Sequence, residues 1–278
     1  MTDAAAQQVD QQPNKQPARL VGGHVGQDDP IGSGLAIGAD AIQLFLSDPQ
    51  GWKAPTFPHP DGAAGLRAAA EDAGIRIYVH SPYVINLAST NNRIRIPSRK
   101  VLQQQLDAAA AVGAAGVVVH GGHVTADDDP AVGYDNWRKA FERLNISCPV
   151  FIENTAGGQH AMARRLDAIA RLWDALDGYD VGFCLDTCHA WAGGMEMPDA
   201  ARQVLAITGR IDLVHANDSQ GDFDSGRDRH TNFGNGTIAV PALLECIAEA
   251  NNADVICETA APGIVQDIEL IRQKLGQA

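Results

Sequence analysis

Eight short apolar segments recur along this chain of 278 residues and constrain its fold more than any other feature. Each is rich in Val, Ile, Leu or Phe and is bounded by Gly, Pro or polar residues, a pattern typical of strands buried on both faces. The predicted strands are 20–24, 41–45, 75–80, 116–120, 149–153, 181–186, 211–215 and 254–258. Amphipathic or Ala-rich segments lie between them, and we expect helices over 63–73, 98–112, 134–144, 161–176, 199–208, 240–250 and 264–275.

This alternation predicts an α/β fold, a (β/α)8 TIM barrel, because eight strand–helix units in a chain of this length match that architecture. An open, doubly wound sheet is the rival fold, but no Gly-x-Gly-x-x-Gly motif follows the first strand. No linker divides the chain beyond residue 18, so we expect a single barrel domain over residues 19–278. Residues 1–18 contain five Gln, two Pro and no aromatic residue, and we expect them to form a disordered tail.

Composition excludes several classes of protein. No apolar run reaches the ~18 residues of a membrane span, and no secretory signal begins the chain, so we expect a cytoplasmic protein without a membrane partner. The five Cys include no Cys-x-x-Cys pair, which argues against a disulfide framework. The net charge of −13 argues against a protein that coats nucleic acid by bulk charge. No large apolar patch is evident, and we expect a monomer.

Seven of the eight predicted strands end in a side chain that can bind a metal. Parallel barrel strands all point the same way, so their carboxyl ends converge on one mouth, where barrel active sites lie. A single His at a strand end is usually a structural residue, but packing gives no reason for seven such ends. The seven residues are His24, His80, His120, Glu153, Asp186, His215 and Glu258.

Loop residues that follow the strands extend this set to nine candidate metal ligands. Imidazole with carboxylate is the ligand set of Zn, Mn or Fe(II), and one ion needs only three or four protein ligands. Nine therefore predict two or three metals at the mouth, which would also balance the repulsion between the carboxylates. The nine are His80, His120, Glu153, Asp186, His189, His215, Asp228, His230 and Glu258.

Three functions remain open for such a site. Clustered metals favour hydrolysis of a phosphate ester, because they activate water and hold the leaving oxygen. A sugar isomerase or epimerase on the same barrel is the alternative, although no Lys ends a strand and an isomerase has no evident use for a third metal. A barrel with structural zinc that binds a partner through its mouth is the non-enzymatic alternative.

Local basic and aromatic residues indicate contact with nucleic acid. Arg93 and Arg95 lie in a segment, 91–100, that carries four cations after the third predicted strand, and Arg227 and Arg229 flank Asp228. Such a patch can bind DNA in an acidic protein, with salt-sensitive affinity. Tyr83 follows the candidate ligand His80 closely and could stack on a base. For the basic segment, the alternative is an ordinary solvated helix start. For Tyr83, the alternative is an aromatic ring that only packs against its neighbours.

Sequence motifs around these residues resemble the endonuclease IV family of apurinic/apyrimidinic (AP) endonucleases, most closely its actinobacterial branch. The match runs from about residue 20 to the C-terminus. It consists of VHSPY (79–83), INLA (85–88), VHGG (119–122), IENTAG (152–157), CLDTCHA (184–190), VHANDS (214–219), DRH (228–230), GNG (234–236) and ICET (256–259).

The resemblance implies three Zn²⁺ per chain, with Mn²⁺ or Fe²⁺ as substitutes, and a DNA-repair hydrolase. The substrate would be double-stranded DNA with abasic sites or blocked 3′ ends, and the protein would act on it at the nucleoid. Cleavage 5′ to the abasic sugar would give a 3′-hydroxyl and a 5′-deoxyribose phosphate. By the family pattern the three metal groups are His80, His120 and Glu153; Glu153, Asp186, His215 and Glu258; and His189, Asp228 and His230.

Within this pattern, Glu153 bridges two metals and is the residue whose loss should harm chemistry most. Tyr83 and Asn86 lie in the family's motifs beside the DNA. Many relatives carry an Arg that enters the DNA stack in the region where this chain has Gln50 or Gly51. The resemblance therefore implies a DNA contact at Gln50, and an insertion into the DNA stack that is weaker or differently built than in those relatives.

Overall fold

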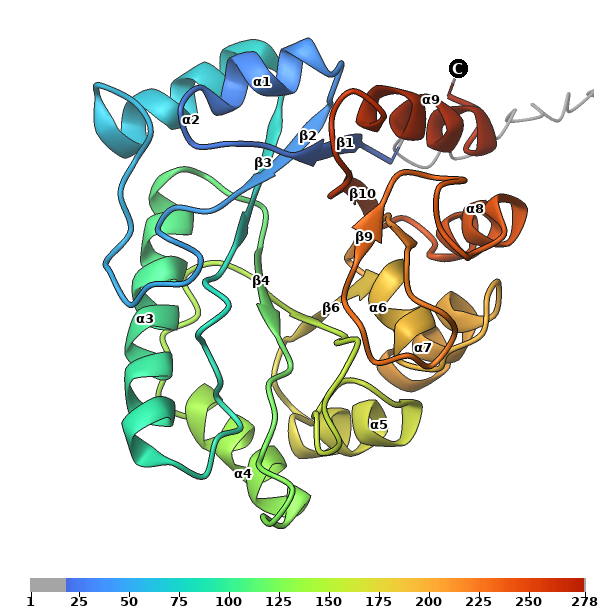
Figure 1. Ribbon diagram of the computed structural model, residues 1–278. Helices are drawn as coiled ribbons and strands as arrows, with labels where there is room; N and C mark the ends of the chain where they lie inside the picture. Colours follow the sequence, from blue (N-terminus) through green and yellow to red (C-terminus); the bar gives the residue numbers. More distant parts are fainter. Residues whose placement is uncertain (1–18, 278) are drawn as a thin grey trace, which may run out of the picture.

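The computed structural model describes residues 19–277, and the predicted tail over residues 1–18 lies outside them. Eight parallel strands close into a barrel in the order β1-β10-β7-β6-β5-β4-β3-β2. The predicted TIM barrel is therefore confirmed, and each strand lies within a predicted segment (Figure 1). The strands are β1 (Val21–His24), β2 (Ala41–Leu44), β3 (Arg76–His80), β4 (Val117–His120), β5 (Val150–Glu153), β6 (Gly182–Asp186), β7 (Leu213–His215) and β10 (Asp254–Cys257).

Helices surround the barrel in chain order (Figure 1). Their buried faces pack on the outer face of the sheet, where Trp137 and Phe183 are among the largest fully buried side chains. The helices are α1 (Pro30–Ala36), α2 (Gly62–Ala73), α3 (Asn92–Ala111), α4 (Pro130–Phe141), α5 (Leu166–Ala175), α6 (Thr187–Ala192), α7 (Ala200–Thr208), α8 (Val240–Glu249) and α9 (Ile264–Lys274). Within residues 19–277, none of these helices combines the length and apolarity needed to cross a membrane.

The predicted start of α3 is wrong by six residues. The sequence places the first helical residue after Pro97, at Ser98, but the helix begins at Asn92 and contains Pro97. The side chain of Asn91 accepts a hydrogen bond from the backbone N–H of Arg93, which is a standard cap of a helix start. Pro97 lies in the second turn of the helix, where it removes the backbone N–H that would bond to the Arg93 carbonyl, and the helix continues through it. Arg93 and Arg95 therefore lie in the first turn of α3 rather than in a free loop.

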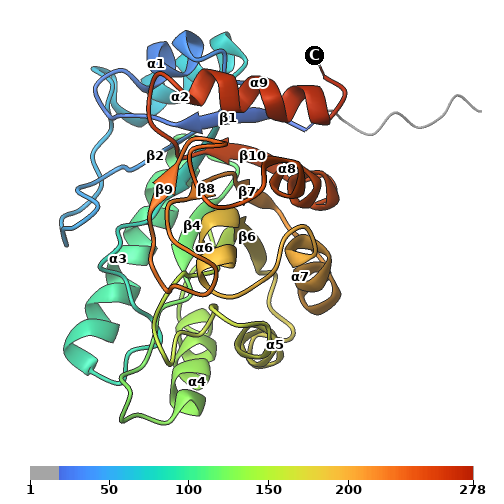
Figure 2. The ribbon, with the colours of Figure 1, turned by 45° about the vertical axis from the view of Figure 1, so that its right-hand side comes forward.

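Three short elements were not predicted from the sequence. Helix α1 follows Asp29, whose side chain accepts from the backbone N–H of Gly32. Helix α6 begins directly after Asp186, which caps it by accepting from the N–H of His189 at 2.6 Å. A two-stranded antiparallel hairpin, β8 (Asp218–Ser219) with β9 (His230–Thr231), lies beside α6 (Figure 2).

A layer of apolar side chains fills the barrel below its mouth, and it explains how the mouth residues are aimed. Side chains two residues apart on a strand face the same side of the sheet, so each member of this layer has a mouth residue two positions after it. Tyr78 thus precedes His80, and Phe151 precedes Glu153. The layer consists of Ala41, Tyr78, Val118, Phe151, Cys184, Leu213 and Ile256.

The opposite end of the barrel is closed by a polar network on the buried carboxylate of Asp254. This carboxylate accepts from the Tyr78 hydroxyl at 2.7 Å, the Arg76 guanidinium at 2.6 Å and the Leu20 backbone N–H at 2.9 Å. Arg76 and Tyr78 lie on β3 and Leu20 directly precedes β1, so the carboxylate joins β10 to two other strands of the barrel floor.

Substituting Asp254 by Ala should destabilise the barrel while leaving the mouth intact. The Tyr78 hydroxyl would lose its acceptor inside the protein, so we expect the free energy of unfolding to fall by about 3 kcal/mol. Urea denaturation followed by circular dichroism measures this loss. Asp180→Ala, at a carboxylate whose side chain is 93% exposed, is the control and should change stability little. Equal stabilities of the two variants would contradict this role for Asp254.

Candidate metal centre

The barrel mouth collects all nine predicted ligands in one cluster. Glu153, Asp186 and His215 are almost fully buried, while Asp228 enters from a loop with 57% of its side chain exposed. Strand register brings the residues together in pairs, because His120 lies opposite Glu153 and Asp186 lies opposite His215 on neighbouring strands. The parallel closed sheet is thus what converts distant positions in the sequence into one site.

The Glu153 carboxylate lies at the centre of this cluster. One oxygen, Oε2, is 3.1 Å from Nε2 of His80 and 3.1 Å from Nε2 of His120. The other, Oε1, is 3.2 Å from Nδ1 of His189 and 3.1 Å from Nδ1 of His215. A carboxylate whose two oxygens each face two imidazoles has the arrangement of a residue that bridges two cation sites.

The ligand atoms separate into groups that could each hold one metal ion, with all atoms of a group within 4.8 Å of one another. Three of these groups contain the same residues as the groups implied by the sequence motifs. They are His80, His120 and Glu153; Glu153, Asp186, His215 and Glu258; and His189, Asp228 and His230. A fourth combination, Asp186, Cys188 and His230, overlaps them.

The donor set and one unpaired nitrogen fit metal ions. Nε2 of His230 is buried and has no hydrogen-bond partner among residues 19–277, although it lies 3.2 Å from Asp228 Oδ1 and 3.5 Å from Asp186 Oδ2. A buried polar atom without a partner is costly, and a metal ion would satisfy this one. Nitrogen and carboxylate oxygen ligands together suit Zn²⁺, Mn²⁺ or Fe²⁺.

Carbonyl oxygens orient the imidazoles from outside the cluster. Nδ1 of His80 is 2.7 Å from the Ser81 carbonyl, and Nδ1 of His189 is 2.9 Å from the Asn154 carbonyl. A carbonyl only accepts, so each of these nitrogens carries the proton. The opposite nitrogen, Nε2, is then left as a metal ligand.

Gln43 of β2 performs the same task for His215, and the sequence analysis missed it. The Gln43 side chain is fully buried, and its carbonyl oxygen accepts from Nε2 of His215 at 2.8 Å. Its amide donates to Glu258 Oε1 at 2.8 Å and lies 3.0 Å from Nδ1 of His24. The available signal was a polar residue inside an apolar strand, two residues after the inward-facing Ala41.

Asn217 and Asp218 support the acidic ligands, one by direct hydrogen bonds and the other through a loop. The sequence analysis missed both roles. Asn217 donates from Nδ2 to Asp186 Oδ2 at 2.7 Å and accepts from the Glu258 backbone N–H at 2.9 Å. The buried Asp218 carboxylate accepts from the backbone N–H groups of Gly234 and Gly236, each at 3.0 Å. Asp218 thereby fixes the loop that brings Asp228 and His230 over the mouth.

Neighbouring imidazoles keep the central carboxylates ionised. Burial alone would raise the pKa of Glu153, but the imidazoles of His215 and His120 hold it well below its usual range. Burial likewise opposes ionisation of Glu258, and His215 again lowers the pKa of that carboxyl group well below its usual range. Two buried carboxylates therefore stay negative and attract cations.

The same pairing raises the pKa of two imidazoles. Burial alone would lower the pKa of His189, but the Asp186 carboxylate raises it well above its ordinary value. Burial would also lower the pKa of His215, but the neighbouring Cys184 and the Glu258 carboxylate raise it well above its ordinary value. Both imidazoles therefore favour the doubly protonated, positively charged form when no metal is bound.

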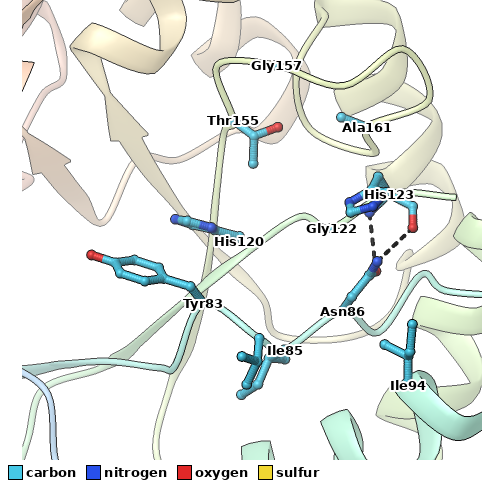
Figure 3. A pocket seen from close by; sticks show the side chains of 11 residues that line it. Tyr83, Ile85, Asn86, Ile94, His120, Gly122, His123, Thr155, Gly157 and Ala161 are labelled. Atoms are coloured by element: carbon cyan, nitrogen blue, oxygen red, sulfur yellow. Dashed lines mark hydrogen bonds between the residues drawn. The ribbon is translucent and has the colours of Figure 1, made fainter. Parts of the chain in front are cut away.

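A cavity of about 350 Å³ opens beside the cluster next to His120 (Figure 3). The ring of Tyr83 is 51% exposed and stacks on His120, with 5.5 Å between ring centroids. Asn86 joins two mouth loops, because its side chain donates to the His123 carbonyl at 2.9 Å and accepts from the His123 N–H at 3.2 Å. Thr155 lines the cavity with a hydroxyl oxygen that has no partner among residues 19–277.

The other predicted DNA-contacting residues lie near the mouth but outside the cluster. Gln50, Arg227 and Arg229 are exposed on loops. The loop of Gln50 reaches Tyr83, whose backbone N–H donates to the Pro49 carbonyl at 2.8 Å. Arg95 is half-buried, because its guanidinium donates to the Ser89 carbonyl at 2.8 Å.

Comparisons with known proteins identify relatives of this chain. A family model described as the xylose isomerase-like TIM barrel matches residues 34–274. A protein of Mycobacterium tuberculosis named probable endonuclease 4 is 56% identical over 257 residues, which are 92% of this chain and 99% of that protein. Solved structures match as well, and two of them are informative.

The crystal structure of endonuclease IV from Thermus thermophilus is 26% identical, with a TM-score of 0.79 over 93% of this chain and 100% of that chain. A D-tagatose 3-epimerase-like protein superposes with a TM-score of 0.73 at 18% identity, over 92% of this chain and 97% of that chain. The second match shows a shared fold alone.

Removing the Gln43 side chain should weaken metal retention without unfolding the barrel. In Gln43→Ala, His215 and Glu258 lose the group that orients them, and losses of such supporting contacts lower metal affinity by about 10–100-fold. Competition with a chromophoric chelator measures the affinity. Gln203→Ala, at an exposed position on α7, is the matched control. Unchanged affinity in Gln43→Ala would show that the carboxamide only fills space.

Metal uptake should release protons. His189 and His215 are protonated in the metal-free protein because their pKa values are raised, so an incoming cation must displace those protons. Apparent affinity should therefore rise with pH across the range below the raised pKa values. Calorimetry of Zn²⁺ binding at pH 7 in buffers of different ionisation enthalpy counts the protons. Uptake without proton release would mean that both imidazoles are already neutral.

Proposed function

The chain belongs to the endonuclease IV family of the xylose isomerase-like TIM barrels, and on this basis we propose that it is a DNA-repair AP endonuclease. It hydrolyses the phosphodiester 5′ to an abasic site and leaves a 3′-hydroxyl and a 5′-deoxyribose phosphate. The observation that carries this proposal is the Glu153 carboxylate, whose two oxygens each face two imidazoles at the open end of the barrel.

The nine clustered side chains would hold three metal ions, and we propose Zn²⁺, with Mn²⁺ or Fe²⁺ as substitutes. Bound divalent ions supply Lewis acidity and positive charge, which generate a hydroxide nucleophile near neutral pH and stabilise a phosphoryl transition state. Glu153 would contribute a ligand to two of the three sites. His189, Asp228 and His230 would hold the third.

The residues around the cluster position the DNA. A distorted strand that enters the cavity beside His120 meets the exposed ring of Tyr83, and stacking on such a ring stabilises an unpaired nucleotide. Asn86 keeps the two cavity loops together through His123. Arg93, Arg227 and Arg229 are exposed around the mouth and would neutralise backbone phosphates.

The substrate is double-stranded DNA with abasic sites, and we extend it to blocked 3′ ends, which present the same phosphate to the cluster. We expect a monomer that acts in the cytoplasm at the nucleoid. The sugar isomerase alternative has weaker support, because the epimerase-like match is 18% identical and the match to the probable endonuclease 4 is 56% identical. The cavity beside the cluster also favours catalysis over a purely structural metal site.

Replacing Glu153 by Gln should abolish catalysis. The carboxamide keeps the shape of the side chain but removes the charge that holds two cations, so we expect incision to fall more than about 100-fold, together with metal content. The assay is incision of an end-labelled duplex with one tetrahydrofuran abasic analogue, before and after chelation and re-addition of Zn²⁺ or Mn²⁺. Elemental analysis runs in parallel.

The matched control for that assay is Glu269→Gln, at an exposed position on α9, which should incise normally. Wild-type protein that binds metal but leaves the abasic duplex intact would contradict the proposal. A panel of ketoses and aldoses would then test the isomerase alternative. Full activity and full metal content in Glu153→Gln would overturn the role given to this residue.

A further inference from the structure

A second basic site lies on the outside of the barrel, between α3 and α4, which are neighbours in Figure 1. It is a concavity of about 190 Å³, and we refer to it as the α3–α4 groove. Four of its six lining residues are cations and none is acidic, although the chain as a whole carries a net charge of −13. The lining residues are Arg95, Arg99, Asn136, Lys139, Ala140 and Arg143.

Helical spacing concentrates these cations. Arg95 and Arg99 are four residues apart and therefore share one face of α3. Lys139 and Arg143 are likewise four residues apart, at the end of α4 and just beyond it. The two pairs line the same concavity from its two sides, so the groove gathers positive charge from two helices.

The protein supplies counter-charge for only part of this cluster. Lys139 forms an ion pair with Asp135 at 2.5 Å, and Arg95 donates to the Ser89 carbonyl at 2.8 Å. Within residues 19–277, the side chains of Arg99 and Arg143 make neither a hydrogen bond nor an ion pair. Cations gathered in a concavity repel one another, and a bound anion would relieve that repulsion.

The chemistry of the groove selects a phosphate group. Guanidinium groups present paired N–H donors that match phosphate oxygens. The half-buried Arg99 and the exposed Arg143, whose guanidiniums have no partner among residues 19–277, offer such donors. Ala140 is the only apolar lining residue, and the lining contains no aromatic ring on which a base could stack. A backbone phosphate suits it better than a nucleobase does.

The position of the groove connects it to the mouth. Arg95 lines the groove and also holds the carbonyl of Ser89, which belongs to the loop that leads from the mouth loops into α3. Thr90, in the same loop, donates to Asp128 of the next mouth loop at 2.8 Å. DNA that crosses the mouth and extends past its rim on this side would pass the groove.

We propose that the α3–α4 groove binds a backbone phosphate of DNA outside the segment held at the mouth. The choice of DNA as the source of the phosphate rests on the proposed function, whereas the anion site itself does not. Such a contact adds affinity for any duplex, damaged or not, and would help this acidic protein to stay on DNA between lesions.

The test compares DNA binding by wild-type protein and the double variant Arg99→Ala/Arg143→Ala across a series of NaCl concentrations. The probe is an undamaged 30-base-pair duplex in a fluorescence anisotropy assay, with metal-loaded protein. One lost phosphate contact should flatten the slope of log K against log[NaCl] by about 0.9. Binding should weaken, while kcat on saturating abasic duplex stays unchanged and KM rises. Thermal unfolding verifies that the variant is folded.

The matched control is Arg67→Ala/Arg202→Ala, which removes two exposed cations from α2 and α7 and gives the same net charge. It should keep the wild-type slope, and an equal loss of slope would overturn the proposal in favour of bulk charge. Equal slopes for wild type and Arg99→Ala/Arg143→Ala would overturn it too.

Calorimetry with inorganic phosphate separates the two sources of the anion. Phosphate binding that depends on Arg99 and Arg143, with unchanged duplex slopes, would assign the groove to free phosphate and overturn the DNA assignment. Failure of wild-type protein to incise abasic duplex would count against the proposed function and would leave the comparison of slopes intact.

Discussion

The Glu153 carboxylate between four imidazoles is the interaction on which the rest of the mouth depends. It is almost fully buried, and a carboxylate in that position is stable only if positive charge surrounds it. His189 and His215, whose pKa values are raised, supply that charge in the metal-free protein, and metal ions would supply it in the active enzyme. His80 and His120 complete the set of four imidazoles from four different segments. The closed parallel sheet is what brings those segments within hydrogen-bonding distance.

Partners outside the cluster determine which face each ligand turns inward. Gln43 fixes His215 and Glu258 together, and Asn217 connects Asp186 to the backbone of Glu258. These amides carry no charge, so they orient the ligands without competing for cations. The mouth is therefore a charged centre enclosed by neutral hydrogen bonds, and this enclosure keeps the ligands in place before metal arrives.

Much of the barrel follows from the sequence, because strands buried on both faces leave a plain apolar pattern and their ends carry His, Asp or Glu. The residues that orient the ligands leave no such pattern. Gln43 makes its contacts with residues far away in the sequence, and nothing local reveals its partners. Pro97 resembles a helix boundary and places the predicted start of α3 too late, whereas the cap at Asn91 marks the true start. The α3–α4 groove joins two helices whose contact appears only in three dimensions.

The most direct test of the central claim is anomalous X-ray scattering from crystals of the metal-loaded protein, recorded on both sides of the zinc absorption edge. The account predicts three peaks at the barrel mouth, one within each group of ligands, with the Glu153 carboxylate bridging two of them. A mouth without peaks, or a single ion that leaves Glu153 uncoordinated, would contradict it.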